Sequence, residues 1–170
     1  MFQKDDYVYY ASGGVCRIVD IRYAPLDGMP ADRQYYVMNS VHDPNGVIYV
    51  PINSDTVFLR RLLTKAEAEA FLDEIPSISL IEEPNAKLLR GRYAEAMKMH
   101  SPTEWVRVIK TVYSRMQALA AVSRSQRISD TERSFAEDAK RYLYAELSQA
   151  LGVPAREMEA HIRAHVEKLA

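Results

Sequence analysis

The stretch EEPNAKLLRGRYAEAMK, residues 82–98, opens the part of the chain that reads as helix throughout. Pro84 disfavours a helix in the residue before it, and Asn85 is of a type that caps helix N-termini. The residues that follow are mostly good helix formers, with no proline among them. The stretch therefore predicts a helix from Asn85 to about Met99, and the whole chain beyond Pro84 reads as helical.

Leu88 and Leu89 are unusual in such a helix, because they are adjacent apolar residues in a basic setting. They lie among Lys87, Arg90 and Arg92. Neighbouring residues on a helix point about 100° apart, so only one of the two leucines can face a core squarely.

Upstream of this stretch the chain reads as short strands. Five segments rich in Val, Ile and Tyr are separated by turn residues such as Gly, Pro, Asp and Asn. The segments are 7–10, 14–23, 33–41, 46–52 and 57–63. Such short connections predict a small antiparallel, strongly bent β-sheet or half-open barrel.

Helix start signals follow the strands. Thr64 begins a capping box, T-K-A-E, that predicts a short helix to about Glu74, where Pro76 stops it. Two more boxes begin at Ser101 and Ser129, and Pro154 opens a last helix. The sequence thus predicts an α+β multidomain protein. We place a β domain at residues 1–75, a linker at 76–84 and an all-helical bundle at 85–170.

The charge is distributed unevenly along the chain. Residues 1–80 carry a net charge of −4 and residues 81–170 carry +3. Residues 86–127 contain nine Lys and Arg against two acids. Such a local excess is typical of a surface that binds a polyanion, although solvated helix surfaces also carry many basic residues. Both interpretations remain open at this point.

Several classes of protein are disfavoured. No apolar run approaches the length of a membrane span, and the acidic start MFQKDDYVYY has neither region of a signal peptide, so we expect a cytoplasmic protein. Two single residues are expected to be buried. Cys16 is the only cysteine, so no internal disulfide can form, and it is expected to be a small buried residue. Trp105 and its apolar neighbours stand at helical spacing and so share one face of a helix, which favours burial of the Trp105 side chain.

Catalysis is not indicated. His161 and His165 share a helix face, as zinc-binding histidines do, but Ile162 stands where the H-E-x-x-H motif has its glutamate. No glycine-rich phosphate loop and no nucleophile motif occurs. We therefore expect no enzyme activity, no metal and no cofactor.

Several weak motifs, in order, resemble the CarD/CdnL family of bacterial transcription regulators. They are M-F-x-x-x-D-x-V-x-Y at the start, I-V-D-I, Q-Y-Y-V-M, Y-V-P-I, E-E-P and R-Y, followed by a helical domain. The resemblance implies that the first domain is a Tudor-like or SH3-like sheet, shared with the transcription-repair coupling factor, that binds the RNA polymerase β subunit. It also implies that the helical domain contacts promoter DNA at the upstream edge of the bubble, largely independently of sequence.

Residue by residue, the resemblance implies two sets of contacts. Its R-Y pair falls on Arg92 and Tyr93, which places Leu89 where the family has a tryptophan that wedges into the minor groove. It implies that Leu89 is offered to DNA while Leu88 packs inward. The remaining implied DNA contacts are Lys87, Arg90, Arg92 and Arg133. The implied polymerase contacts are Arg22, Tyr23 and Tyr49.

Three hypotheses follow. The first is a monomeric, polymerase-bound regulator that contacts DNA and stabilises the open complex. The second is a polymerase-binding module without productive DNA contact, in which both leucines are buried. The third is an unrelated enzyme that uses His161 and His165. The sequence favours the first.

Overall fold

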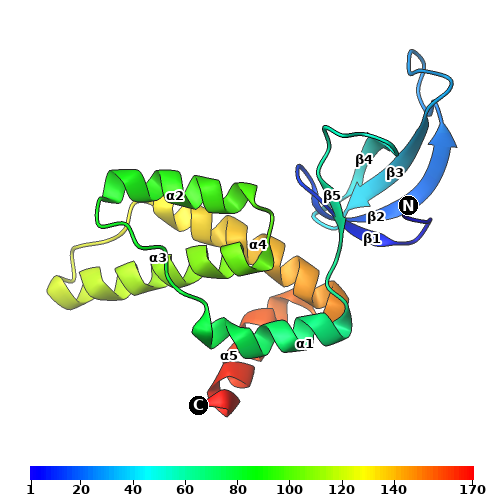
Figure 1. Ribbon diagram of the computed structural model, residues 1–170. Helices are drawn as coiled ribbons and strands as arrows, with labels where there is room; N and C mark the ends of the chain where they lie inside the picture. The colour runs from blue at the N-terminus through cyan, green and yellow to red at the C-terminus, as the bar shows by residue number, and fades with distance from the viewer. The chain divides into compact units, whose positions relative to one another are not determined.

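The computed structural model describes residues 1–170 and divides into two compact units, Met1–Thr64 and Lys65–Ala170 (Figure 1). The first unit is a five-stranded antiparallel sheet and the second contains five α-helices. This architecture confirms the predicted α+β fold. None of the helices combines the length and the apolarity needed to cross a bilayer.

The sheet of the first unit has the strand order β4-β3-β2-β1-β5. Its strands are β1 (Tyr7–Tyr10), β2 (Gly14–Tyr23), β3 (Gln34–Ser40), β4 (Asp43–Pro51) and β5 (Leu59–Arg61). The register between β2 and β3 shifts between Ile18 and Asp20, so that β2 carries one extra residue there. Such a bulge increases the local twist and bends the sheet, as the predicted half-open barrel requires.

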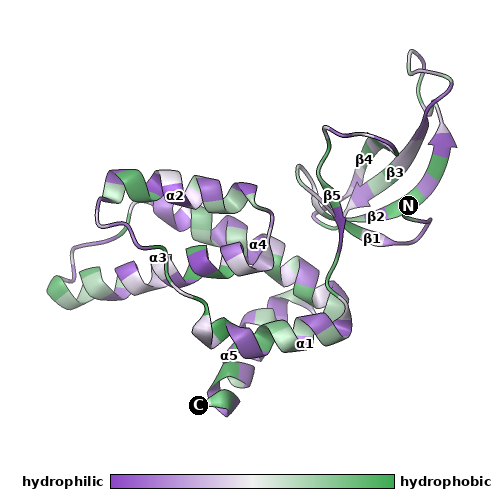
Figure 2. Cartoon of the chain, viewed as in Figure 1, coloured by the Kyte–Doolittle hydropathy of each residue, from purple (hydrophilic) through white to green (hydrophobic).

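One face of the bent sheet holds the core of the first unit. Alternate residues of the strands point to this face, although β3 buries Tyr35 and Val37 on the other face as well. Figure 2 shows apolar and polar stretches along the strands. The buried members of the cluster are Val8, Cys16, Ile18, Tyr36, Met38 and Val50. Cys16 is fully buried, as predicted, and burial raises the pKa of its thiol to about 11. The thiol is therefore protonated and a poor nucleophile at neutral pH.

The second unit contains the helices that the capping signals predict. They are α1 (Lys65–Glu74), α2 (Ala86–Lys98), α3 (Pro102–Val122), α4 (Asp130–Leu151) and α5 (Met158–Leu169), with short 3₁₀ turns at Ile75–Ser77 (η1) and Ala155–Glu157 (η2). Asn85 caps α2 by accepting from the backbone N–H groups of Lys87 and Leu88. Ser101 precedes α3 without a side-chain cap bond, so the capping box predicted there is not formed.

Antiparallel packing of α3 and α4 forms the centre of the helical unit. Trp105 of α3 is fully buried, and its ring centroid lies 5.8 Å from that of Tyr142 on α4. The prediction that this tryptophan is a core residue is confirmed. It is therefore not available as a surface wedge.

The predicted domain boundary differs from the structure. We expected α1 to end the β domain and residues 76–84 to be a linker, but α1 packs on α4 and α5 and belongs to the second unit. Its apolar face, with Ala68, Phe71 and Leu72 buried, is covered by those helices. The spacing of these residues shows that the helix has an apolar face, but it does not show which domain covers that face.

The segment after α1 is fastened to the helical unit rather than free. The Lys110 ammonium on α3 donates to the carbonyl oxygens of Ile75 at 3.1 Å, Pro76 at 3.3 Å and Ile78 at 2.6 Å. The Ile81 N–H donates to the Thr111 hydroxyl at 2.9 Å. Because these bonds occupy backbone groups that an extended segment would otherwise expose, the segment is held along α3.

Candidate functional site

The leucine pair of α2 is oriented opposite to the prediction. Leu89 is only 2% exposed, whereas Leu88 is 58% exposed. Leu89, Tyr93 and Ala96 are the buried residues of α2. The expectation that Leu89 is offered to DNA and Leu88 packs inward is therefore wrong, because Leu89 lies on the core face of the helix.

A signal for this orientation was present in the sequence. Leu89, Tyr93 and Ala96 follow the spacing i, i+4, i+7, which gathers them on one face. The same spacing from Leu88 leads to Arg92 and Glu95, which are charged. Alignment with the family's wedge tryptophan alone selected Leu89 as the exposed leucine, but the exposed one is Leu88.

A buried polar network fixes the core face of α2. The Tyr93 hydroxyl donates to Glu132 Oε1 at 2.7 Å, and Arg115 Nε donates to the same oxygen at 2.6 Å. Glu132 is 6% exposed. Burial, and then the bond to Glu132, raise the pKa of Tyr93, so its hydroxyl remains a donor. The network joins α2, α3 and α4 and so sets the rotation of α2.

Glu132 has a different role from the predicted one. The sequence indicated a capping box with Ser129, and the first half of it forms: the Ser129 hydroxyl accepts from the Glu132 N–H at 3.1 Å. The Glu132 carboxylate points instead to Tyr93 and Arg115. No local pattern could have identified partners that lie 39 and 17 residues away in the chain.

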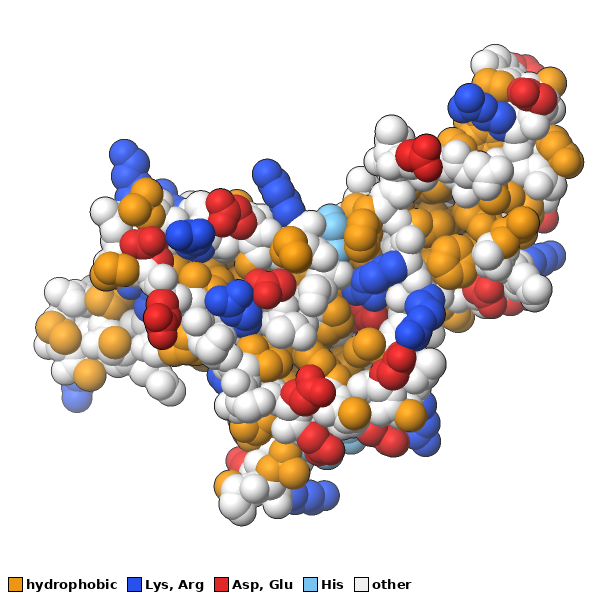
Figure 3. Space-filling model, viewed as in Figure 1, with side chains coloured by type: hydrophobic (Ala, Val, Ile, Leu, Met, Phe, Trp, Pro, Cys, Tyr) orange, Lys and Arg blue, Asp and Glu red, His pale blue; other side chains and the backbone are white.

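A basic stripe runs along one side of α2. Lys87, Arg90 and Lys98 recur at helical spacing, are exposed and form no ion pair. In Figure 3, Lys and Arg side chains project from both ends of this helix. The three charges are free to neutralise phosphates, so this stripe is the candidate DNA-binding surface of the second unit.

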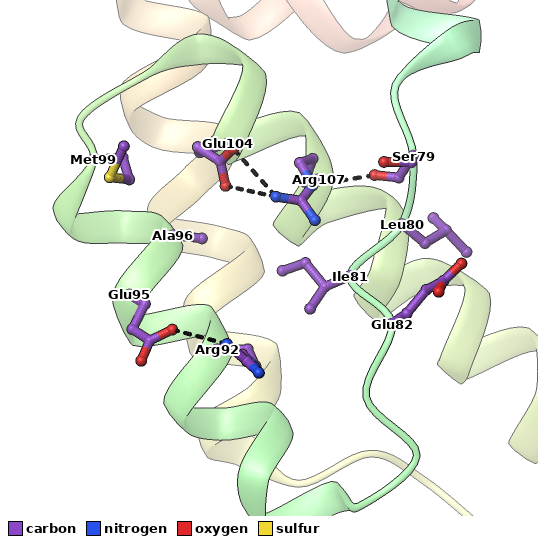
Figure 4. Close-up of a pocket in the computed structure, with 10 residues that line it drawn as sticks. All are labelled: Ser79, Leu80, Ile81, Glu82, Arg92, Glu95, Ala96, Met99, Glu104 and Arg107. Carbon is purple, nitrogen blue, oxygen red and sulfur yellow. Dashed lines mark hydrogen bonds and ion pairs between the residues drawn. The ribbon is translucent and has the colours of Figure 1, made fainter.

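The other side of α2 borders a groove of mixed charge. The groove has a volume of about 640 Å³ and lies between α2, the start of α3 and residues 79–82 (Figure 4). Arg92 contacts Glu95 at 3.5 Å, and Arg107 contacts both carboxylate oxygens of Glu104, at 3.2 and 3.1 Å. Because these carboxylates accompany the two arginines, the groove is a poor polyanion site.

The predicted DNA contacts are thus separated by the structure. Lys87 and Arg90 lie on the basic stripe, Arg92 lies on the groove side and Leu89 is buried. Arg133, in the first turn of α4, has a half-exposed side chain at 4.0 Å from Asp130. The exposed apolar residue at the start of α2 is Leu88, which was expected in the core.

The three predicted polymerase contacts lie at the β2–β3–β4 side of the sheet. Directly paired residues share a face, which groups Asp20, Val37 and Tyr49 in one row and Arg22, Tyr35 and Pro51 in the next. Arg22 and Tyr49 therefore share the face opposite the core cluster. Tyr23, one residue after Arg22, points to the other face and is 63% exposed.

Arg22 is held by a local ion pair. Its Nε donates to Asp20 Oδ2 at 2.5 Å, and this bond lowers the pKa of the Asp20 carboxyl. The Arg22 side chain is 65% exposed and that of Asp20 is 35% exposed, so the pair positions Arg22 on the surface and contributes little to stability.

β4 is an edge strand with an unpaired side. The Ile52 N–H donates to the Gln34 carbonyl at 3.0 Å, which sets the alternation of bonded pairs between β3 and β4. The backbone N–H and C=O groups of Ile48 and Val50 therefore point to β3 and bond to it. Val47 and Tyr49 therefore direct their backbone N–H and C=O groups to the open edge, which is a template for one more strand.

The two histidines of α5 have different surroundings. His165 Nε2 lies 2.6 Å from Asp73 Oδ1 on α1, and His161 is exposed. No group of three or more His, Cys, Asp or Glu side chains has a metal-binding arrangement. The contact with Asp73 fastens α5 to α1.

Comparison with known proteins identifies the first unit. The family model of the CarD-like/TRCF RID domain matches residues 2–63, which is nearly the whole β unit. No curated protein matches the chain. The domain match implies, in general terms, an interaction with the RNA polymerase β subunit. The β unit of this chain therefore belongs to the CarD-like/TRCF RID domain family.

Proposed function

We propose that the chain binds the RNA polymerase β subunit through its first unit, contacts promoter DNA at the upstream edge of the bubble through its second unit, and stabilises the open complex. The observation that carries this proposal is the RID match over residues 2–63, on a sheet whose β4 edge is unpaired. We further propose that the protein acts in the cytoplasm as a monomer, by binding and not by catalysis.

The polymerase contact uses the open edge of β4. An added strand takes its hydrogen bonds from the outward backbone groups of Val47 and Tyr49, and side chains on the two faces provide selectivity. Tyr49 lies on β4 itself and adjoins an added strand directly. Arg22 and Tyr23 lie on β2, two strands further in, so they would contact parts of the polymerase that extend over the sheet.

The DNA contact uses the basic stripe of α2. Lys87, Arg90 and Lys98 contact phosphates, which gives affinity without sequence recognition. Leu88 lies at the same end of the helix as Lys87 and is available to insert between base steps, since insertion needs apolar bulk. A protein that binds the open promoter more tightly than the closed one shifts the population toward the open state by that difference in affinity.

The polymerase contact is tested by Tyr49→Pro. Proline removes the outward N–H of this position but no bond to β3, because edge strands accept proline where the N–H faces solvent. We expect the affinity for core RNA polymerase to fall about tenfold, as expected for the loss of one backbone bond and the crowding of the edge. Tyr49→Phe keeps the N–H and is the matched control. Equal affinity of Tyr49→Pro and wild type would show that β4 is not the docking edge.

The DNA contact is tested by the double variant Lys87→Gln, Arg90→Gln. Each lost phosphate contact reduces the slope of log affinity against log salt by about one, so we expect the slope to fall by about two for the polymerase–promoter complex. Arg163→Gln, Lys168→Gln removes the same charge from α5 and should leave the slope unchanged. Footprinting should show protection at the upstream bubble edge for wild type and its loss for the Lys87/Arg90 variant.

A second candidate function is a polymerase-binding module without productive DNA contact. It is favoured by the burial of Leu89, which occupies the family's wedge position, and by the mixed charge of the groove beside α2. In this case wild-type protein would bind polymerase and leave the promoter footprint unchanged.

A further inference from the structure

We infer that the groove beside α2 binds a short segment of a partner protein in which an apolar residue lies between an acidic and a basic one. The groove is the one drawn in Figure 4, between α2, the start of α3 and residues 79–82. It lies on the side of α2 away from the basic stripe, so the inference goes beyond the proposed DNA contact and does not depend on it.

The charged side chains of the groove are separated by sign. Glu95 on α2 and Glu104 on α3 each lie about one helical turn from the turn that joins the two helices. Arg92 and Arg107 pair with these carboxylates at the spacing i, i+3 and lie further from that turn. Because the two helices are antiparallel (Figure 1), the carboxylates lie toward one end of the groove and the guanidinium groups toward the other (Figure 4). Glu82 also borders the groove, but its side chain points to the far side of residues 79–82 in Figure 4. The groove is therefore bipolar and suits a ligand that carries both signs of charge.

The two ion pairs of the groove differ in how firmly they are held. Arg92 and Glu95 are 3.5 Å apart, and their side chains are 57% and 70% exposed. Such a pair contributes little to stability, so both side chains can exchange partners with a ligand. Arg107 contacts both carboxylate oxygens of Glu104 and also donates to the Ser79 carbonyl at 3.4 Å. The α3 pair is thus a fixed wall, and the α2 pair is the one available to a ligand.

Apolar side chains lie between and beside the charges. Ala96 is buried in the lining, and half-buried Ile81 points into the groove in Figure 4. Leu80 and Met99 also border the groove and are 38% and 63% exposed. The volume of about 640 Å³ is within the range of ligand sites. Because the exposed apolar side chains extend the contact surface beyond the charged groups, the groove fits a protein segment better than a free amino acid.

Peptide titration of the full chain tests the proposal. The probe is a short peptide with blocked ends and the sequence Gly-Asp-Leu-Lys-Gly, together with the peptide of reversed order. We expect at least one of the two to shift the backbone amide NMR signals of Ala96, Met99 and Arg107 saturably. Peptides with Lys-Leu-Lys or Asp-Leu-Asp in the same frame should bind about tenfold more weakly, because each brings a like charge to one end of the groove.

A charge swap supplies the second measurement. The double variant Arg92→Glu, Glu95→Arg keeps the net charge and the i, i+3 spacing but reverses the order of the charges, so it should bind the mixed peptide at least about fivefold more weakly. Asp138→Arg, Arg141→Asp swaps a similarly exposed pair on α4 that does not line the groove, and should bind like wild type. Thermal unfolding of both variants verifies that they fold.

Three results would overturn the proposal. The first is the lack of any saturable shift with the mixed peptides. The second is equal affinity for mixed and uniformly charged peptides, or for wild type and the Arg92/Glu95 swap. The third is binding of free glutamine as tight as that of the mixed peptide, which would identify a small-molecule site. None of these results bears on the polymerase or DNA contacts.

Discussion

Glu132→Ala is expected to lower the free energy of unfolding of the chain by about 3 kcal/mol, because it removes the acceptor shared by Tyr93 and Arg115. The Tyr93 hydroxyl is then left buried without this acceptor, and Arg115 loses its carboxylate. The side chain of Arg115 is 32% exposed, so solvent compensates part of its loss. Glu132→Gln retains an acceptor for Tyr93 and should cost about half as much.

Urea unfolding of the full chain measures this effect. Glu137→Ala on the same helix is the matched control, because that carboxylate is 66% exposed and lies 3.6 Å from its partner Lys140. We expect the control to change stability by less than about 0.5 kcal/mol. Equal losses for Glu132→Ala and Glu137→Ala would show that the network does not fix α2.

Leu89→Ala and Leu88→Ala are expected to have opposite consequences. Leu89→Ala removes a fully buried side chain and should destabilise the chain by about 3 kcal/mol, as lost burial and the remaining cavity both contribute. Leu88→Ala removes an exposed side chain and should change stability by less than about 0.5 kcal/mol. Chemical denaturation of the two variants gives the comparison directly.

The lifetime of the open promoter complex separates the functional roles of the two leucines. If Leu88 inserts between base steps, Leu88→Ala shortens that lifetime while polymerase binding stays at the wild-type level. Under conditions where Leu89→Ala remains folded, its open complex should live as long as that of wild type. If only Leu89→Ala shortened the lifetime, Leu89 would be the residue that inserts into DNA, and the inward orientation of Leu89 would be contradicted.

Much of the fold was predictable because its signals are local. Strand segments, turn residues and the caps at Asn85 and Ser129 act within a few residues of each other, and the strands and helices begin and end close to their predicted limits. For the first unit, the RID match over residues 2–63 confirms the resemblance that the ordered motifs of these residues indicated. The role of each surface residue toward polymerase or DNA stays a prediction.

The domain boundary was not predictable from these signals. A helix with one apolar face can pack on either neighbouring domain, and α1 follows β5 directly in the chain. Only the positions of α4 and α5, which cover Phe71 and Leu72, assign it to the helical unit. The position of residues 75–81 was not predictable either, because carbonyl groups of this segment accept from Lys110, more than thirty residues away in the chain.

The sequence by itself determined that α2 exists, that it is basic, and that one of its adjacent leucines must leave the core, because neighbours on a helix diverge by about 100°. Which leucine leaves was decided by tertiary structure. The bond from Tyr93 to Glu132 on α4, supported by Arg115 on α3, sets the rotation of α2. Leu89 turns inward with Tyr93, and Leu88 remains exposed beside the basic stripe. Residues far apart in the chain therefore determine which leucine is buried, because a buried hydroxyl and a buried carboxylate must form hydrogen bonds.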